Sequence, residues 1–300
     1  MVKTTYTLEA VEKFLKNKAG DKGKSVRNLV EGNISQAFSF KTEQNETLVL
    51  RIAPQANDFL CDRYAFEALG TRLPIPRVRE IGNFDSTSYF CISDFVEGKP
   101  SNALGPAAIN AIQPEILRTC GKVFTTDISA TSGYGPVEIT SGNGKFATWQ
   151  ESIQSELDYS KPFHLHASNI NLDAALVDAL VEQVRVNSPF ASEQRYLLHK
   201  DFGFDNILIH EEKVVAVIDW ACISYGDWMY DYAKSDFWWP GYQDDKHKFA
   251  AEYELDNQNL NQREALYWAV IALSAISFAD KFQNQDVAKW LQDNVPSKII

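Results

Sequence analysis

The sequence predicts an α+β chain with two lobes, in which a small strand-rich lobe precedes a larger helical lobe. Before residue 97, short apolar segments rich in β-branched residues alternate with polar turns, which is typical of strands. After residue 98, longer segments carry apolar residues at helical spacing. Residues 96–100 (VEGKP) are typical of a loop between the two parts. We therefore expect two domains, at residues 1–97 and 98–300.

The expected elements follow this division. In the first lobe Thr7 can cap a helix, and Gly70, followed by the proline bend, can end a second one. The expected first-lobe elements are a helix at 7–18, strands within 26–51 that include a hairpin at 37–52, a helix at 58–69, and strands at 77–82 and 89–95. The expected second-lobe helices lie at 106–128, with a restart at Pro114, and at 171–186, 228–238 and 263–281.

Residues 199–206 (HKDFGFDN) form the most specific pattern of the chain. They match H-x-D-x-x-x-x-N and are followed by a predicted hairpin and then by Asp219. Asn206 and Asp219 would lie together at the open end of that hairpin, where an amide oxygen and a carboxylate suit Mg²⁺. Asp201 could orient a hydroxyl group and accept its proton, with the histidine bracing the loop. Each acid alone is equally consistent with a turn cap, but the joint spacing is typical of phosphoryl-transfer enzymes.

A nucleotide site is expected in the first lobe. Residues 31–38 lie between two predicted strands, and Ser35 could present a hydroxyl group to a phosphate, although an ordinary hairpin turn explains the segment equally well. Arg51 lies where a kinase strand would carry a lysine, and its guanidinium can bind phosphate oxygens in a bidentate manner. Its ion-pair partner would be Asp62 or Glu67, and we favour Asp62 from its distance before the proline bend.

Charge is divided unevenly along the chain. Residues 1–97 hold 13 Lys and Arg against 13 Asp and Glu, whereas residues 98–300 hold 16 against 27, which accounts for the whole net charge of −11. This balance argues against a nucleic-acid partner, because phosphates need a basic surface. It favours a cationic small-molecule acceptor drawn to an acidic cleft, although a solvated acidic surface explains the charge equally well.

The remaining composition predicts a cytoplasmic monomer without a membrane partner. No apolar run is long enough to span a bilayer, and the N-terminus lacks the apolar core of a signal peptide. The four cysteines are scattered and form no C-x-x-C pair, which is typical of small buried side chains in a reducing compartment.

The chain resembles the aminoglycoside phosphotransferase family over nearly its whole length. The H-x-D motif is specific to the kinase-like superfamily, and residues 226–231 (GDWMYD) narrow the match to its small-molecule branch. Residues 237–240 (FWWP) narrow it further, towards the hygromycin-type subgroup. The other segments that carry the resemblance are 11–15, 36–40, 62–64, 73–76, 89–93, 131–136 and 148–149.

This resemblance implies a two-lobed protein-kinase-like fold and MgATP-dependent phosphorylation of an antibiotic hydroxyl group, with hygromycin B as the first acceptor to consider. GTP could replace ATP. By position, Asp201 would be the catalytic base, Asn206 and Asp219 would hold Mg²⁺, and Arg51, paired with Asp62, would hold the nucleotide phosphates.

The resemblance also implies contacts to the base and the acceptor. The backbones of Ser93 and Phe95 would bind the nucleotide base. Asp227, Asp231 and Trp238 would face the acceptor, although acids in this motif also brace the loop, and a core position for Trp238 is equally consistent. Two other functions stay open: a kinase of another small-metabolite hydroxyl group, and a nucleotide-binding pseudokinase, which Arg51 and the single-glycine loop would favour.

Overall fold

A computed structural model describes residues 5–19, 24–29, 34–159, 163–239 and 245–296. The chain divides into two compact units. The first unit comprises residues 1–119 and 204–222, and the second unit comprises residues 120–203 and 223–300. The segment after the H-x-D loop therefore belongs to the first unit by its contacts, whereas the sequence analysis placed it in the second lobe. The predicted lobe boundary at residue 97 itself stays a prediction.

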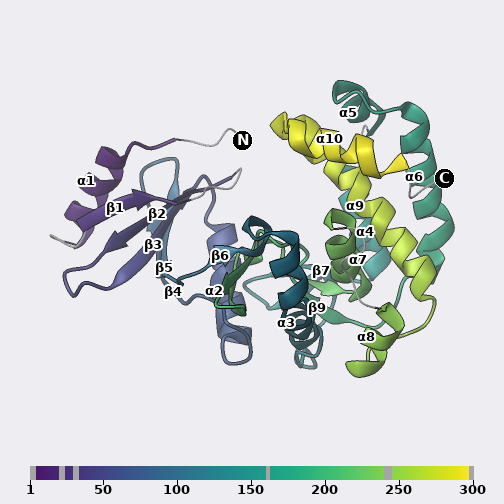
Figure 1. Cartoon of the computed structure of the whole chain (residues 1–300), viewed down its shortest axis with the longest axis horizontal. Helices are drawn as coiled ribbons and strands as arrows, with labels where there is room; N and C mark the ends of the chain where they lie inside the picture. Colours follow the sequence, from purple (N-terminus) through teal and green to yellow (C-terminus); the bar gives the residue numbers. More distant parts are fainter. Residues whose placement is uncertain (1–4, 20–23, 30–33, 160–162, 240–244, 297–300) are drawn as a thin grey trace. The chain divides into compact units, whose positions relative to one another are not determined.

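The first unit contains a five-stranded antiparallel sheet with the strand order β1-β2-β3-β5-β4. One face of the sheet packs against α1 (Leu8–Ala19) through Val11 and Leu15, which meet alternate residues of the strands (Figure 1). Because strand side chains alternate between faces, the opposite face is left for Arg51 and its neighbours. The other elements of the sheet region are β1 (Lys24–Asn28), β2 (Gln36–Lys41), β3 (Thr47–Ala53), α2 (Asn57–Leu69), β4 (Val78–Asn83) and β5 (Tyr89–Asp94).

A second, three-stranded sheet in the first unit has the order β11-β10-β6. The strand β6 (Lys99–Pro100) pairs with β10 (Ile207–His210), which pairs in turn with β11 (Lys213–Val217). The short helix η1 (Ser101–Ala103) and α3 (Pro106–Phe124) follow β6. Pro114 lies inside α3 rather than at a restart, so the helix tolerates the loss of one backbone donor.

A four-stranded sheet in the second unit has the order β8-β7-β12-β9. The sequence analysis did not predict β7 (Tyr134–Glu138) or β8 (Asn143–Phe146), which hold glycines and charged residues in place of a β-branched run. The other two strands are β9 (Tyr196–Leu198) and β12 (Ser224–Gly226). The strands β9 and β12 pair antiparallel, with Leu198 opposite Ser224 and Tyr196 opposite Gly226, so the start of the H-x-D loop lies beside the start of β12.

The helix α9 (Leu260–Phe282) is the central helix of the second unit (Figure 1). It packs against the helices on both sides of it. It is long and apolar enough to cross a membrane by length and composition alone, so the prediction that no apolar run reaches that length is wrong. Most of its apolar stretch is buried inside the unit, which accounts for that composition. The other helical elements are α4 (Trp149–Tyr159), α5 (Phe163–Asn169), α6 (Ala174–Asn187), η2 (Ser188–Phe190), α7 (Met229–Trp238), α8 (Lys246–Glu252) and α10 (Gln285–Asn294).

The cysteines are free thiols, as expected from their spacing. Cys61, Cys91 and Cys120 are buried, whereas Cys222 is exposed, so the prediction of buried side chains is confirmed for three and wrong for one.

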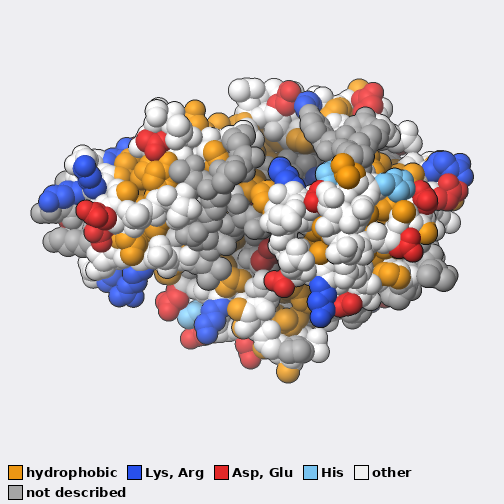
Figure 2. All heavy atoms as spheres, turned by 90° about the horizontal axis from the view of Figure 1, so that it is seen from above, with side chains coloured by type: hydrophobic (Ala, Val, Ile, Leu, Met, Phe, Trp, Pro, Cys, Tyr) orange, Lys and Arg blue, Asp and Glu red, His pale blue; other side chains and the backbone are white. Residues whose placement is uncertain are grey.

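Acidic and basic side chains are interspersed on the face of the chain that Figure 2 shows.

Candidate active site

The hairpin after the H-x-D loop forms as predicted. Ile207 pairs with Val217, and His210 pairs with Lys213 around a two-residue turn. The N–H of Ile218 donates to the carbonyl of Asn206 over 2.9 Å, so Asn206 and Asp219 lie at the open end of the hairpin. Asn206 is buried and Asp219 is exposed. Asp219 also has φ +63°, a sparsely populated conformation that is typical of functional sites.

Arg51 and Asp62 form an ion pair, which confirms the partner chosen over Glu67. Asp62 is 6% exposed and also accepts a hydrogen bond from the backbone N–H of Trp220 over 2.9 Å. It therefore connects α2 to the residue next to Asp219. Burial alone would lower the pKa of the Arg51 guanidinium, but nearby negative groups, including Asp62 and Asp219, raise it on balance. The pairing of Arg51 with Asp62 is thus established, whereas phosphate binding by Arg51 stays a prediction.

The predicted base-contacting residues lie on or near the face of the sheet that carries Arg51. In β3 and β5, Arg51 pairs with Cys91 and Val49 pairs with Ser93, and directly paired residues share a face of the sheet. Phe95 follows the end of β5 and is 39% exposed. Ser35 precedes β2 and is partly exposed, while residues 31–33 of the predicted phosphate loop lie outside the described residues.

The H-x-D loop of the second unit is held by its own backbone and by α7. His199 is fully buried, and its Nδ1 accepts from the N–H of Asp201 over 3.2 Å. This supports the structural role expected for the histidine. The ammonium of Lys234 lies 2.6 Å from the Asp201 carboxylate and also donates to the carbonyl of Lys200 over 3.0 Å. One lysine of α7 therefore fixes both the carboxylate and the backbone of the loop.

A lysine of the loop itself is anchored to α4. Lys200 forms an ion pair of 2.5 Å with Glu156 of α4, and its ammonium lies 4.6 Å from the ring centroid of Tyr230. Glu156 also accepts from the hydroxyl groups of Tyr230 and Ser274, over 2.8 and 3.1 Å. Burial would raise the pKa of Glu156, but the Lys200 ammonium lowers it on balance.

The sequence analysis missed this arrangement of two lysines and one glutamate. Glu156 is far from the motif in sequence, and a lysine on a helix is usually a solvated charge. One signal was present, because Lys234 lies one helical turn after the Tyr230-Asp231 pair of the Gly-Asp motif.

Asp227, which was predicted to face the acceptor or to brace the loop, lies inside the second unit. Asp227 is 0% exposed, and its carboxylate pairs with Arg263, which is also fully buried. It accepts further hydrogen bonds from the Tyr267 hydroxyl over 2.7 Å and from the backbone N–H of Ser192 over 3.2 Å. No surface of this carboxylate is left for a substrate, so its role is to join β12 to α9.

Asp231 is likewise 0% exposed, and its carboxylate accepts from the N–H of His199 over 2.7 Å. This residue braces the catalytic loop, the alternative that the sequence left open. Trp238 is partly buried, and its ring lies 5.0 Å from that of Trp290 on α10. Stacking of Trp238 on an acceptor stays a prediction.

The buried carboxyl group of Asp231 predicts a pH-dependent stability. Burial raises its pKa from 3.8 to about 7, so between these values the folded chain binds this proton more tightly than the unfolded chain. Its contribution to stability is therefore complete at low pH and is lost as the pH rises towards 7. We expect Asp231→Asn to remove a slope of about 1 kcal/mol per pH unit from the unfolding free energy.

Urea unfolding of both proteins between pH 5 and pH 7 measures this slope. Asp236→Asn, on the same helix but partly exposed, is the matched control and should keep it. Equal slopes in the wild-type and Asp231→Asn proteins would contradict the prediction.

Comparison with known proteins places this geometry in a family. The Phosphotransferase enzyme family matches residues 25–273. Hygromycin-B 4-O-kinase of Escherichia coli is 32% identical over 243 residues, which covers 80% of this chain and 70% of that protein. A thermostable mutant of aminoglycoside phosphotransferase APH(4)-Ia, in ternary complex with AMP-PNP and hygromycin B, superimposes with a TM-score of 0.81 at 28% identity, covering 97% of this chain and 98% of that one.

A more distant structure shares the fold alone. Aminoglycoside phosphotransferase APH(3'')-Id from Streptomyces rimosus has a TM-score of 0.61 at 16% identity, covering 90% of this chain and 99% of that one. The fold prediction is confirmed, because an N-terminal antiparallel sheet precedes a mostly helical region in the kinase-like arrangement. The family match covers most of the chain, and this protein therefore belongs to the Phosphotransferase enzyme family and is a kinase of the aminoglycoside-phosphotransferase type.

Proposed function

We propose that this chain transfers the γ-phosphoryl group of ATP to a hydroxyl group of an aminoglycoside or aminocyclitol antibiotic, with hygromycin B as the first acceptor to test. The observation that carries the proposal is the Asp201 carboxylate, held by Lys234 on a braced loop five residues before Asn206 and the hairpin. Two relatives support the acceptor, because one is a hygromycin-B kinase and the other is in complex with hygromycin B.

Asp201 acts on the acceptor in this mechanism. Its carboxylate accepts a hydrogen bond from the attacking hydroxyl group, orients that oxygen towards the γ-phosphorus, and takes its proton as the bond forms. Lys234 keeps the carboxylate in one orientation. This positioning matters because phosphoryl transfer needs little from the protein beyond alignment and charge neutralisation.

The first unit would bind the nucleotide. The Arg51 guanidinium, kept in place by Asp62, would neutralise phosphate oxygens. The backbones of Ser93 and Phe95 would bind the base, and Ser35 would contact phosphate. AMP-PNP in the APH(4)-Ia complex supports ATP as the donor, with GTP as the alternative nucleotide.

Asn206 and Asp219 have the right chemistry for Mg²⁺. They bring one amide oxygen and one carboxylate to the same end of the hairpin, and Mg²⁺ commonly takes one or two protein oxygens and completes its shell with phosphates and water. When bound, the ion would neutralise charge on the phosphates.

Removing the charged metal ligand should weaken metal-dependent nucleotide binding. We expect Asp219→Asn to raise the Mg²⁺ concentration for half-maximal ATP-analogue binding by about 10-fold. Fluorescent-nucleotide titration at a series of Mg²⁺ concentrations measures this, with Asp205→Asn as the control for a neighbouring exposed acid. An unchanged Mg²⁺ dependence in Asp219→Asn would refute the assignment.

Lys234 should affect turnover more than binding. We expect Lys234→Met to lower kcat by about 10- to 100-fold with little change in the KM for ATP, because Asp201 loses its fixed orientation. Lys234→Arg should recover most of the activity. Lys246→Met is the matched control, because Lys246 pairs with Glu264 at 2.7 Å and is equally shielded. A wild-type kcat in Lys234→Met would refute the positioning role.

A coupled ADP-release assay with MgATP tests the proposed function directly. Hygromycin B, kanamycin and no acceptor are compared under the same conditions. Release that depends on hygromycin B, and that Asp201→Ala abolishes, supports the proposal. ATP binding without release on either antibiotic refutes the antibiotic acceptor.

The second candidate is a kinase of another small-metabolite hydroxyl group. One observation favours it, because Asp227 and Asp231 are buried and bonded within the second unit. These two carboxylates were expected to attract the ammonium groups of an antibiotic, and their burial leaves them unavailable to an acceptor. A panel of neutral sugars and amino alcohols in the same assay separates the two candidates.

A further inference from the structure

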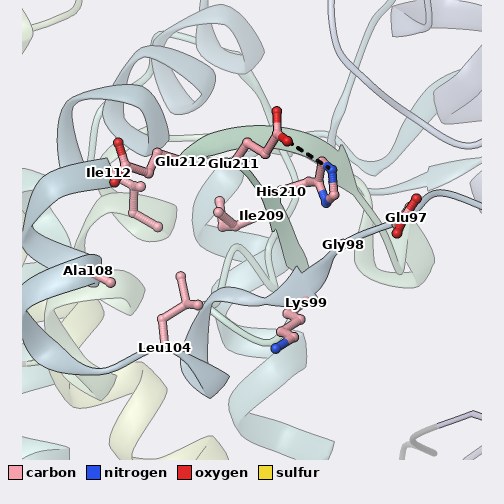
Figure 3. A pocket seen from close by; sticks show the side chains of 10 residues that line it. All are labelled: Glu97, Gly98, Lys99, Leu104, Ala108, Ile112, Ile209, His210, Glu211 and Glu212. Atoms are coloured by element: carbon pink, nitrogen blue, oxygen red, sulfur yellow. Dashed lines mark ion pairs between the residues drawn. The ribbon is translucent and has the colours of Figure 1, made fainter.

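A pocket of about 470 Å³ lies in the first unit beside the closed end of the β10–β11 hairpin (Figure 3). Its lining comes from residues 97–99, from the start of α3 and the loop before it, and from residues 209–212. The volume is within the usual range for small-molecule pockets. None of its lining residues belongs to the predicted catalytic, metal or nucleotide set.

One wall of the pocket is aliphatic. Leu104, Ala108 and Ile112 follow one another at a spacing of four residues, and Ile209 of β10 joins them (Figure 3). Ile112 and Ile209 are 2% and 6% exposed, so they are part of the packed interior. A ligand that covers this wall must have an apolar body, because the wall offers no polar partner to a hydroxylated one.

The rim of the pocket is acidic. Glu97, Glu211 and Glu212 contribute three carboxylates, against one ammonium from Lys99. His210 faces Glu211 at 4.0 Å (Figure 3). Glu97, Glu211 and Glu212 are exposed, and the rim therefore attracts a cation.

The two glutamates occupy a turn that other residues form more easily. Glu211 has φ +47° and Glu212 has φ +61°, and a two-residue hairpin turn with both φ values positive normally takes Asn-Gly. The turn therefore places two glutamates next to each other at the rim.

We propose that this pocket binds a small organic cation with an apolar body, of the arylalkylammonium type. The apolar body would cover the wall formed by Leu104, Ala108, Ile112 and Ile209, and the ammonium group would meet the carboxylates of the rim. A polyhydroxylated aminoglycoside lacks such a body, so this ligand differs from the proposed acceptor. The proposal does not depend on the proposed function, because binding is measured without nucleotide or acceptor.

Three compounds separate the contribution of the apolar body to binding from that of the ammonium group. Tryptamine has both an aromatic body and an ammonium group, indole-3-propionate has the body with a carboxylate, and 1,4-diaminobutane has ammonium groups without the body. We expect isothermal titration of the full chain to show tryptamine binding at least about 10-fold tighter than either comparison compound, a difference of about 1.4 kcal/mol. Methyl NMR signals of Ile112 and Ile209 should shift on addition of tryptamine.

Variants locate the binding in the pocket. Ala108 is exposed on α3, so Ala108→Trp can fill the pocket without disturbing the core and should abolish tryptamine binding. Glu212→Gln should weaken it about threefold, whereas Glu43→Gln, an exposed acid in the turn of another hairpin, should not. Circular dichroism checks that each variant is folded.

Three results would overturn the proposal. These are no tryptamine binding up to about 10 mM, equal binding of tryptamine and indole-3-propionate, and tryptamine binding that survives Ala108→Trp in a folded protein.

Discussion

Asp201→Ala lowers turnover by at least about 10³-fold and leaves nucleotide binding largely intact. This is the loss expected when a positioned base and its orienting contact are both removed. The variant should remain folded, because the Asp201 side chain is 42% exposed and Lys234 keeps its hydrogen bond to the carbonyl of Lys200. Single-turnover kinetics with the acceptor that passes the ADP-release assay measure the chemical step.

Controls separate catalysis from folding and binding. Titration with AMP-PNP should give a similar dissociation constant for the wild-type and Asp201→Ala proteins. Asp178→Ala, which removes an exposed carboxylate on α6, should keep wild-type turnover. Near-normal turnover in Asp201→Ala would refute the mechanism, whereas a parallel loss of AMP-PNP binding would mean that Asp201 supports the nucleotide site.

Asp227→Ala destabilises the protein by about 3–5 kcal/mol, because it leaves a buried guanidinium without its counter-charge. Arg263 is 0% exposed, and both its Nε and one terminal nitrogen donate to Asp227. The Tyr267 hydroxyl loses its acceptor in the same variant. Urea unfolding at constant pH measures the change in the free energy of unfolding.

The double variant Asp227→Ala/Arg263→Met tests the reason for this loss. Removing both charges should cost less than the sum of the two single changes, because no unpaired charge stays buried. Asp178→Ala again serves as the exposed control, with no measurable loss expected for its exposed pair with His164. A loss below about 1 kcal/mol for Asp227→Ala would mean that water or another acid replaces the carboxylate.

The local parts of the fold and site could be predicted from the sequence. The hairpin between Asn206 and Asp219 forms as expected, because strand propensity and turn position are properties of neighbouring residues. The strands of the five-stranded sheet were predicted for the same reason, whereas β6 lies in the segment that was predicted to be a loop. Asp62 could be chosen over Glu67 from its distance before the proline bend, because the ion pair joins a strand to the helix that directly follows it.

Other features depend on partners that are distant in sequence. The strands β7 and β8 lack an alternating pattern, and β7 is held by pairing with β12, almost 90 residues later. Pro114 lies within α3, because tertiary packing of the helix outweighs the loss of one hydrogen bond. The H-x-D motif therefore identified the reaction class, but the sequence could not assign a role to every acid in the H-x-D and Gly-Asp motifs.

The sequence by itself determined which groups are available for the chemistry. These are a carboxylate at Asp201, an amide and a carboxylate at Asn206 and Asp219, and a guanidinium at Arg51, all at the spacing of a phosphotransferase. Only the tertiary structure decided that Asp227 and Asp231 are buried braces and that Lys234 holds Asp201. The physical reason is that a motif fixes residue types along the chain, whereas the exposure and ion-pair partner of a charge depend on how distant elements pack around it.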